Sequence, residues 1–394
     1  MEKMTSKERL LAAIDGKPVD RIPVSPRVWR FALGKNASQV DIARKYDFDL
    51  LYCDPGVFNA SDQVLMTPVQ DILCETSDTK LPDIAVDVKT EREGKKIRAE
   101  RTIRTPGGIL HDVVLVPDTC SEYGINPDPH FLEPLVKDEN DVELLPYLLP
   151  RAELVRTRFP VARVLESNIG ETGLISFRPT IGVDEMVVNT LGVTQSLILS
   201  IENPDMFNRM IEIFDQWHMA IMKIVLEDGW KLIFDAWYNF SLSLGWSPEF
   251  YRQIVFPLIK RHTDFIHSYD AKMFFYDDGD MAGSIDAILE TGADIIQTLP
   301  PPPTGDIDYK ELSARHGGKA CFNCGVDTVK IRYGKPDEIE HDVREVLDIM
   351  APGGKFILGT SDSIPDGSPE ENVMAFFSTA REYGQEIAFR LYGK

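Results

Sequence analysis

The second half of the chain alternates between short apolar runs and longer stretches whose apolar residues recur at helical spacing. The runs, which we expect to be strands, cover residues 173–177, 231–234, 272–275, 294–298, 320–322 and 355–358. Strands that alternate with helices predict parallel βα units. Because so many units follow one another, the pattern favours a closed (β/α)8 TIM barrel over an open sheet.

The first residues of the chain predict a helix with two clear ends. Thr5 and Glu8 have the spacing of a capping box, and Gly16 follows the last apolar residue of the pattern, where a glycine commonly ends a helix. Pro18 and Pro23 bracket a linker, and residues 22–28 read as an extended segment that enters the core.

Two later helices also begin with recognisable signals. Residues 247–267 have apolar positions at helical spacing, with Ser247 as the expected cap and a proline at the first helical position. The last helix opens at residues 368–371 with the same arrangement, in which Ser368 is the expected cap.

Residues 85–118 follow a different pattern. Two β-like runs, 97–103 and 110–116, are separated by turn residues. This predicts a β-hairpin or a small meander and not a barrel unit. We therefore expect residues 1–394 to form a single TIM-barrel domain with an N-terminal extension and an inserted β-hairpin at about 85–118.

Carboxylates follow several of the predicted strands. In a barrel, residues just past the carboxyl end of each strand face the active site. The candidate catalytic residues at these positions are Asp235, Tyr238, Asp277, Asp278 and Asp362. One acid after a strand is more often a helix cap, but several acids at one mouth raise one another's pKa, so that one can serve as a general acid. The same cluster suits a metal ion equally well, and the sequence leaves the metal unknown.

A second set of residues near the strand ends is suited to holding a substrate. These residues are Arg27, Trp29, Phe31, Arg178, Trp237, Asn239, Tyr276, Asn323, Cys324 and Ser361. Together with Tyr238, the aromatic members Trp29, Phe31 and Trp237 are placed to wall an apolar slot for a ring, although core packing is the alternative for such side chains.

Composition narrows the choice of partners. A net charge of −21 argues against nucleic acid, because phosphate binding needs a clustered basic face. No apolar run approaches the length of a membrane span, and no apolar signal segment opens the chain, which predicts a cytoplasmic protein. The pair Cys321 and Cys324 is a lone CxxC, for which buried strand residues are as good a reading as ligands or redox groups. The helical patterns that contain His218, His262 and His267 favour solvated or packed side chains.

Three segments of the chain resemble the uroporphyrinogen decarboxylase superfamily. Residues 8–24 (ERLLAAIDGKPVDRIPV) are similar to its opening, and residues 247–257, which begin SPEF and end in proline, are similar to one of its helices. Residues 359–384, which contain IPDGSPEEN and AREYG, resemble its C-terminal signature. The resemblance covers nearly the whole chain and is specific to the superfamily more than to one activity within it.

The resemblance favours one branch of this superfamily. The decarboxylases carry an arginine-rich substrate motif of the RQAGRY kind near the N-terminus, whereas residues 27–31 here read RVWRF. The insertion at 85–118 is similar to the methyltransferase branch. Members of that branch move a methyl group between a small substrate and the cobalt of a cobalamin that a separate corrinoid protein carries.

Within that branch, the members that act on thiols bind zinc through a His-x-Cys and a further cysteine. The positions that look equivalent here are Tyr276, Asp278 and Ser361. An all-oxygen set departs from the thiolate pattern and suits a substrate whose leaving atom is oxygen, with zinc as a possible further cofactor. The resemblance therefore implies a methyltransferase of the O-demethylase type, which moves methyl from an aryl methyl ether to cob(I)alamin on a partner protein and releases the phenol.

In this hypothesis the ether lies in the barrel mouth with its methyl group outward, and the corrinoid protein docks over the C-terminal face of the barrel. The chain's task is to help a poor leaving group, a phenolate whose conjugate acid has a pKa of about 10. Two alternatives remain. A uroporphyrinogen-type decarboxylase needs cations to hold several carboxylates, and a non-catalytic ligand-binding barrel needs no acid at all.

Overall fold

The computed structural model describes residues 3–54, 81, 83–117 and 130–393 of the chain. The chain divides into two compact units. Unit 1 comprises Met1–Asp54, Pro160–Phe177 and Trp230–Lys394, and unit 2 comprises Pro55–Phe159 and Arg178–Gly229. The expectation that residues 1–394 act as a single domain stays a prediction.

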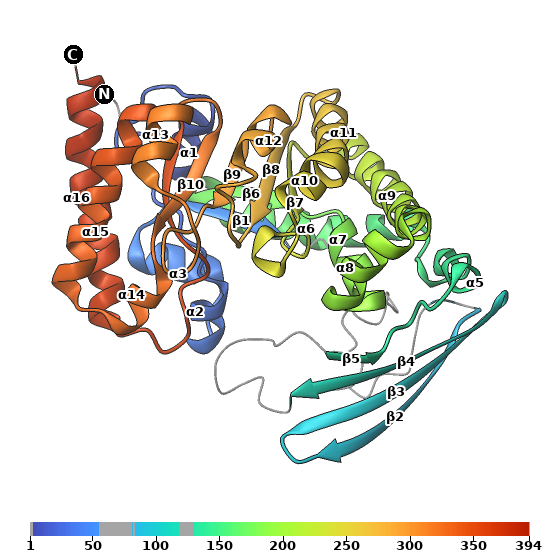
Figure 1. Cartoon of the computed structure of the whole chain (residues 1–394). Coiled ribbons are helices and arrows are strands. Elements are labelled where there is room, and N and C mark those ends of the chain that lie inside the picture. Colours follow the sequence, from blue (N-terminus) through green and yellow to red (C-terminus); the bar gives the residue numbers. More distant parts are fainter. Residues whose placement is uncertain (1–2, 55–80, 82, 118–129, 394) are drawn as a thin grey trace. The chain divides into compact units, whose positions relative to one another are not determined.

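A seven-stranded parallel sheet forms the centre of unit 1 (Figure 1). Its strands, in spatial order, are β1 (Leu50–Asp54), β6 (Gly173–Phe177), β7 (Leu232–Ala236), β8 (Lys272–Asp277), β9 (Ile295–Thr298), β10 (Cys321–Val326) and β11 (Phe356–Thr360). Strands that are consecutive in unit 1 are neighbours in space, and most of their residues are buried. The predicted α/β class with parallel strands is therefore confirmed.

The six predicted runs correspond to β6 to β11, but several strands extend further than predicted. β7 includes Asp235, β8 includes Tyr276 and Asp277, and β10 continues to Val326. These polar or small residues were expected in loops because apolar runs end before them. They remain in the ladder because pairing with the neighbouring strand continues, for example between Asp277 and Thr298.

Helices connect the strands of unit 1. They are α1 (Ser6–Ile14), α2 (Trp29–Gly34), α3 (Gln39–Tyr46), α6 (Phe159–Ile169, whose first residue belongs to unit 2), α10 (Pro248–Phe250), a π-helical turn η6 (Tyr251–Val255), α11 (Phe256–His267), α12 (Ile285–Glu290), α13 (Tyr309–His316), α14 (Thr328–Tyr333), α15 (Pro336–Met350) and α16 (Glu370–Tyr392). Short 3-10 turns are η4 (Gly170–Thr172), η5 (Leu242–Leu244) and η7 (Ala351–Gly353).

Three of the predicted helix ends can be compared with the structure. Thr5 and Glu8 form the expected capping box, and Ser247 accepts a hydrogen bond from the Phe250 amide. The expected cap at Ser368 is wrong. Its hydroxyl donates to the Pro365 carbonyl, and Pro369 is the residue that precedes the first turn of α16.

The extended segment 22–28 lies between the two edge strands of the sheet. On one side, the Ser25 amide donates to Leu358 of β11, and Val24 and Arg27 form parallel bridges with Leu358 and Ser363. On the other side, the Asp49 amide, directly before β1, donates to the carbonyl of Val24. The segment is therefore bridged on the β11 side and hydrogen-bonded to the residue before β1 on the other.

A buried carboxylate, Asp49, anchors this segment. It accepts two hydrogen bonds from Arg21, at 2.8 and 3.0 Å, and one from Arg9 of α1, at 2.5 Å. The Val24 amide donates to the same side chain at 2.9 Å. Asp49 is fully buried and Arg9 is 4% exposed, so the pair depends on this complete set of partners.

Unit 2 contains a four-stranded antiparallel sheet, in which the predicted insertion forms the first three strands (Figure 1). The strands are β2 (Ala85–Glu93), β3 (Lys96–Thr105), β4 (Gly108–Pro117) and β5 (His130–Glu133). Ala99, Val114 and Val116 form a small apolar core. Arg101 and Asp112 face each other on β3 and β4 as a fully buried ion pair, so this sheet also holds one charge pair away from water.

The remaining elements of unit 2 are helical. They are α5 (Glu139–Val142), the 3-10 turns η2 (Leu145–Leu148) and η3 (Ala152–Arg158), α7 (Val183–Leu191), α8 (Val193–Glu202) and α9 (Pro204–Glu227). The longest, α9, begins after Asn203, whose side chain accepts from the Met206 amide, and has a proline at its first position.

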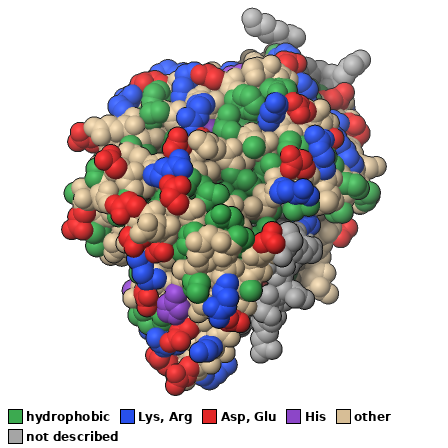
Figure 2. Space-filling model, turned by 90° about the vertical axis from the view of Figure 1, so that its right-hand side faces the viewer, with side chains coloured by type: hydrophobic (Ala, Val, Ile, Leu, Met, Phe, Trp, Pro, Cys, Tyr) green, Lys and Arg blue, Asp and Glu red, His purple; other side chains and the backbone are tan. Residues whose placement is uncertain are grey.

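Acidic and basic side chains are interspersed on the face shown in Figure 2, so the acidic excess is not gathered into one patch there. In the part of the chain that the structure describes, no helix combines the length and hydropathy that crossing a bilayer requires.

The anchor at Asp49 gives the first testable prediction. Asp49→Ala leaves the Val24 amide without its acceptor and removes one of the two carboxylates that Arg9 binds, so we expect a loss of about 3–5 kcal/mol in the free energy of unfolding. The matched control Glu290→Ala removes an exposed carboxylate from its pair with Arg252 and should cost less than about 1 kcal/mol. Urea unfolding curves of the two variants measure both values, and equal losses would contradict the anchoring role.

Candidate active site

Four predicted site residues meet where the strands of unit 1 end. We call Arg27, Tyr276, Asp278 and Asp362 the mouth cluster. The Tyr276 hydroxyl donates to Asp278 at 3.0 Å, and the Arg27 guanidinium stacks 4.1 Å from the centre of the Tyr276 ring. Arg27 also donates to Asp362 across 3.5 Å. Residues from the first segment of the chain, from β8 and from the loop after β11 therefore share one site.

The mouth cluster contains one fixed cation among acids. Burial lowers the pKa of Arg27, but the neighbouring Tyr276, Asp362, Cys53 and Asp278 raise it more, so the guanidinium stays charged. Burial raises the pKa of Tyr276 well above its usual value, with only partial opposition from Arg27, which keeps the phenol neutral. The cluster is therefore a neutral donor and a permanent cation facing two carboxyl groups.

Asp278 is the acid in this cluster with an altered proton affinity. Its pKa is raised above the ordinary value of 3.8, first by the protein around it and then by the charge of Asp362, while Arg27 and the Tyr276 hydroxyl lower it. The residue nevertheless has an exposed surface. Its exposed surface leaves the carboxyl group of Asp278 open to a small ligand from solution.

Asp277 lies between Tyr276 and Asp278 in sequence but contacts different groups. Its side chain is fully buried and accepts from the Gly279 amide at 2.9 Å. Burial, and then the charge of Asp278, raise its pKa to about 8, and the Gly279 amide and the Ser241 hydroxyl lower it.

Asp235 is also separate from the mouth cluster in its contacts. It is buried in β7, and its carboxylate is bonded to the ring nitrogen Nδ1 of His262 on α11 at 2.8 Å. The Trp237 ring packs against the same histidine, with ring centres 5.7 Å apart. His262 was expected to be solvated or packed, and it is buried with a carboxylate partner.

Three predicted binding residues have partners within the protein. The Asn323 amide donates to the carbonyls of Ser25 and Ile357, and its oxygen accepts from Gln297. Ser361 accepts from the Thr328 amide at 3.0 Å. Cys324 is fully buried, and burial raises the pKa of its thiol.

The aromatic candidates differ in exposure. Phe31 and Trp237 are completely buried, whereas Trp29 is 39% exposed. The Tyr238 ring stands edge-on to Tyr276, with ring centres 6.2 Å apart, and so lies next to the mouth cluster. Asn239 is buried, and its carbonyl accepts from the Trp246 indole.

Arg178 belongs to unit 2, although it directly follows β6. Its guanidinium is bonded to the Ile181 carbonyl and to Glu185. Within unit 2 it therefore holds the start of α7, and its assignment as a binding residue stays a prediction.

Two residues beside the site were not predicted from the sequence. Gln297, at the end of β9, holds Asn323, and Cys53, near the end of β1, has a partly exposed thiol close to Arg27. Both follow the strand-end rule, so the available signal was their position after an apolar run. β1 itself was missed because its run is short and follows directly on a helix.

Side chains join the loops that carry the site. Ser243, after β7, accepts from the Asp280 amide at 2.5 Å, and Asp306, after β9, accepts from the Met281 and Ala282 amides at 2.8 and 2.9 Å. In the loop after β11, the Ser363 hydroxyl accepts a hydrogen bond from the Arg30 amide at 3.1 Å. The strand-end loops are thus bonded to their neighbours as well as to their own strands.

The oxygen set at Tyr276, Asp278 and Ser361 does not fit a zinc ion. The Tyr276 hydroxyl is engaged by Asp278, Ser361 accepts from the Thr328 amide, and the positive charge of Arg27 lies against the same ring. A cation in this position opposes the binding of a second one. No role for zinc is therefore derived from these residues.

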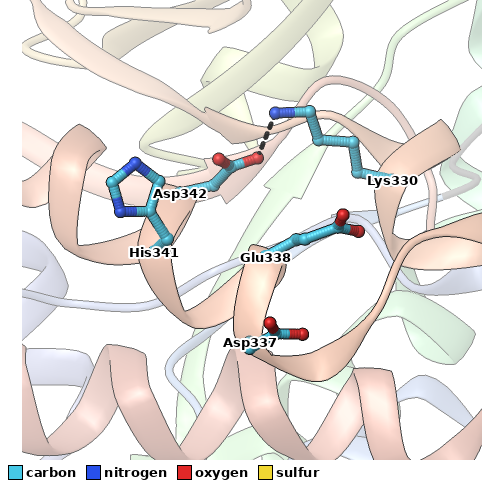
Figure 3. A pocket seen from close by; sticks show the side chains of 5 residues that line it. All are labelled: Lys330, Asp337, Glu338, His341 and Asp342. Atoms are coloured by element: carbon cyan, nitrogen blue, oxygen red, sulfur yellow. Dashed lines mark hydrogen bonds and ion pairs between the residues drawn. The ribbon is translucent and has the colours of Figure 1, made fainter.

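A different group of possible metal ligands lies on α15. His341, Asp342 and Glu345 have donor atoms within 4.8 Å of one another, and the first two border a pocket of about 410 Å³ (Figure 3). His341 and Glu345 are exposed, and Asp342 is paired with Lys330 at 2.6 Å. These are ordinary features of a solvated helix, and the pocket contains none of the predicted site residues.

Comparison with known proteins agrees with the resemblance seen in the sequence. The family model for uroporphyrinogen decarboxylase (URO-D) matches residues 122–383, which is more than half of the chain. A uroporphyrinogen decarboxylase from a strain of Prochlorococcus marinus is 25% identical over 303 residues, which cover 73% of this chain and 82% of that protein. The corresponding enzyme from Mannheimia succiniciproducens is 22% identical over 289 residues, or 70% and 78% of the two chains.

Among solved structures, a methyltransferase from Methanosarcina mazei is similar over 97% of this chain and 99% of its own, with a TM-score of 0.59. At 16% sequence identity this likeness establishes a shared fold. The names of the sequence relatives and of the solved structure give different activities. The matched family model shows that the chain belongs to the uroporphyrinogen decarboxylase family.

Proposed function

We propose that the protein is a corrinoid-dependent methyltransferase of the O-demethylase type, which removes the methyl group from an aryl methyl ether. The observation that carries this proposal is the mouth cluster. It offers a carboxyl group with a raised pKa, Asp278, in an open position beside a permanent cation, Arg27. An ether oxygen that leaves as a phenolate needs both a proton and a positive charge.

The nucleophile in this proposal comes from outside the chain. Cys321 and Cys324 are fully buried, and burial raises the pKa of both thiols, so neither offers a thiolate. This is consistent with an enzyme whose methyl acceptor is supplied separately. When a corrinoid protein is bound, its cob(I)alamin supplies a strong nucleophile, and the chain's own residues orient the ether and assist the leaving group.

Each member of the mouth cluster has a role in the proposal. Protonated Asp278 donates its proton to the ether oxygen as the methyl–oxygen bond breaks, so that neutral phenol leaves and the carboxylate remains. Arg27 stabilises the charge that develops on that oxygen, and Asp362 holds Arg27 in place. Water then returns a proton to Asp278, which its exposed position permits.

The fold is consistent with a corrinoid protein that approaches the carboxyl ends of the strands. We infer that segment 22–28 takes the eighth place in a closed barrel, because it is bonded both to β11 and to the residue before β1. In a closed barrel, the corrinoid protein docks over the face at the carboxyl ends of the strands, where the mouth cluster lies. The likeness in fold to a methyltransferase is consistent with this arrangement.

A uroporphyrinogen-type decarboxylase is the second candidate, favoured by the names of the sequence relatives. Such a substrate carries several carboxylates, each of which needs a cationic partner. In the mouth cluster the single cation, Arg27, already faces Asp362 and Asp278. Loss of carboxyl groups from uroporphyrinogen in the presence of the purified protein would support this candidate.

The proposed reaction is tested directly with a panel of methyl donors. The protein is mixed with a reduced corrinoid protein and methoxybenzenes, methylamines or methylated thiols. We expect loss of the cob(I)alamin absorbance together with release of the matching phenol, and only with the aryl ethers. A flat trace with every methoxyarene contradicts the proposal.

Replacing the proposed acid separates an enzyme from a binding protein. Asp278→Asn keeps the size of the side chain but removes its acidic proton, so we expect the single-turnover rate to fall by about 100-fold to 10,000-fold. Asp280→Asn, two residues along the same loop, is the matched control and should retain the rate. Titration with a methoxyarene checks that both variants bind the donor. Equal rates in the wild type and Asp278→Asn would favour another acid.

The pH dependence of the reaction rate gives a further test, because two substitutions should shift it in opposite directions. Asp278 acts in its protonated form, so the rate falls as pH rises through its pKa. The negative charge of Asp362 raises this pKa and the positive charge of Arg27 lowers it. We therefore expect Asp362→Asn to move the basic limb of the rate profile to lower pH and Arg27→Gln to move it to higher pH. Shifts in the same direction would exclude Asp278 as the titrating acid.

A further inference from the structure

Asp277 is enclosed between three strand-end loops instead of facing the mouth cluster. One oxygen, Oδ1, accepts from the Gly279 amide at 2.9 Å. The other, Oδ2, is buried, and no described N–H group donates to it. The Ser241 hydroxyl, from the loop after β7, and the Asp278 amide lie near the same carboxyl group and lower its pKa.

This set of partners suits a neutral carboxylic acid. An ionised carboxylate has about four acceptor sites and needs several donors when it is buried, whereas a neutral acid donates one hydrogen itself. One amide donor on Oδ1 and a buried Oδ2 to which no described N–H group donates match the neutral form better than the ionised one. The elements packed against Asp277 offer it uncharged groups, and the charge that acts on it most is that of Asp278.

Gly279 brings the serines and the acid together. A side-chain carbon at this position would collide with the hydroxyl oxygens of Ser241 and Ser243, so the two loops approach as closely as a glycine allows. Ser243 in turn accepts from the Asp280 amide at 2.5 Å. Gly279 therefore packs against the loop after β7, and Asp280 is bonded to it.

The opposite side of the same loop is held by β9 and the loop that follows it. The Thr298 hydroxyl donates to the Asp277 carbonyl at 3.2 Å, and Asp306 accepts from the Met281 and Ala282 amides. Asp278 thus lies in a loop whose other residues are bonded on both sides.

We propose that Asp277, in its neutral form, is the positioning residue that fixes the loop after β8 and thereby holds Asp278 against Tyr276 and within reach of the ether oxygen. This inference rests on the proposed function for the role of Asp278, but the state of Asp277 is independent of it. Asp277 acts through the loop and does not contact the substrate. Burial and the charge of Asp278, which raise its pKa to about 8, agree with a carboxyl that is neutral near pH 7.

The first arm of the test is stability as a function of pH in the full chain. The wild-type carboxyl is protonated in the folded state up to about pH 8 but ionises near its ordinary value of 3.8 when the chain unfolds. Its contribution to stability is therefore complete below pH 3.8 and is lost progressively as pH rises to about 8. Asp277→Asn cannot ionise, so its stability relative to the wild type should increase steadily over this range and stay level above it.

Asp280→Asn is the matched control for this arm, because it also replaces an aspartate by an asparagine and lies in the same loop. Its stability difference from the wild type should not follow the same course with pH. A pH-independent difference for Asp277→Asn would show that Asp277 is ionised in the folded protein, and this would overturn the proposal.

The second arm compares two substitutions at the same position. Asp277→Ala removes the acceptor of the Gly279 amide and the polar group beside Ser241, so Asp278 loses its position and we expect kcat to fall by about 100-fold with little change in KM. Asp277→Asn preserves an acceptor for the Gly279 amide and a polar group beside Ser241, and should lose far less. Equal losses in kcat for Ala and Asn would also overturn the proposal. An inactive wild type would instead count against the proposed function, while the stability arm still decides the state of Asp277.

Discussion

The structure of unit 1 depends on one buried carboxylate, Asp49. It binds Arg9 and Arg21 and receives the Val24 amide, and so ties the first helix and the following extended segment to the start of β1. A buried carboxylate is stable only when nearly all its acceptor sites are used, which makes this arrangement all-or-none. Because the segment is fixed at Val24, the chain reaches the strand ends three residues later, and Arg27 arrives beside Tyr276 and Asp362.

The position of Arg27 decides the chemistry of the site. Without Arg27, the strand ends would present acids and a phenol, a set that attracts metal ions. With it, the mouth cluster has its own cation, and the neighbouring acids divide into an exposed one, Asp278, and a buried one, Asp277. The two are adjacent in sequence, yet one faces open space and the other faces serines of the preceding loop. In our proposal, Asp278 therefore acts as the acid, and its neighbour Asp277 supports the loop that carries it.

The fold class was readable from the chain because each βα unit carries a local signal. A short apolar run followed by a stretch with apolar residues at helical spacing is the same pattern wherever it occurs, and β6 to β11 were predicted from it. β1 and the strands β2 and β5 were harder to find, since short or half-exposed strands have weak periodicity. The cap at Ser368 failed because a serine hydroxyl can donate to a nearby carbonyl as readily as it can accept from an amide.

For the site, the sequence by itself determined which residue types follow the strands, and therefore the concentration of acids and the presence of Tyr276 and Asp278. Only the tertiary structure decided which of them meet. Arg27 and Asp362 are more than three hundred residues apart and share a contact because the first segment bridges to β11. The pairing of Asp235 with His262 and the burial of Asp277 were likewise invisible in the chain. Side-chain direction and burial depend on neighbouring strands and loops, and local sequence does not encode that packing.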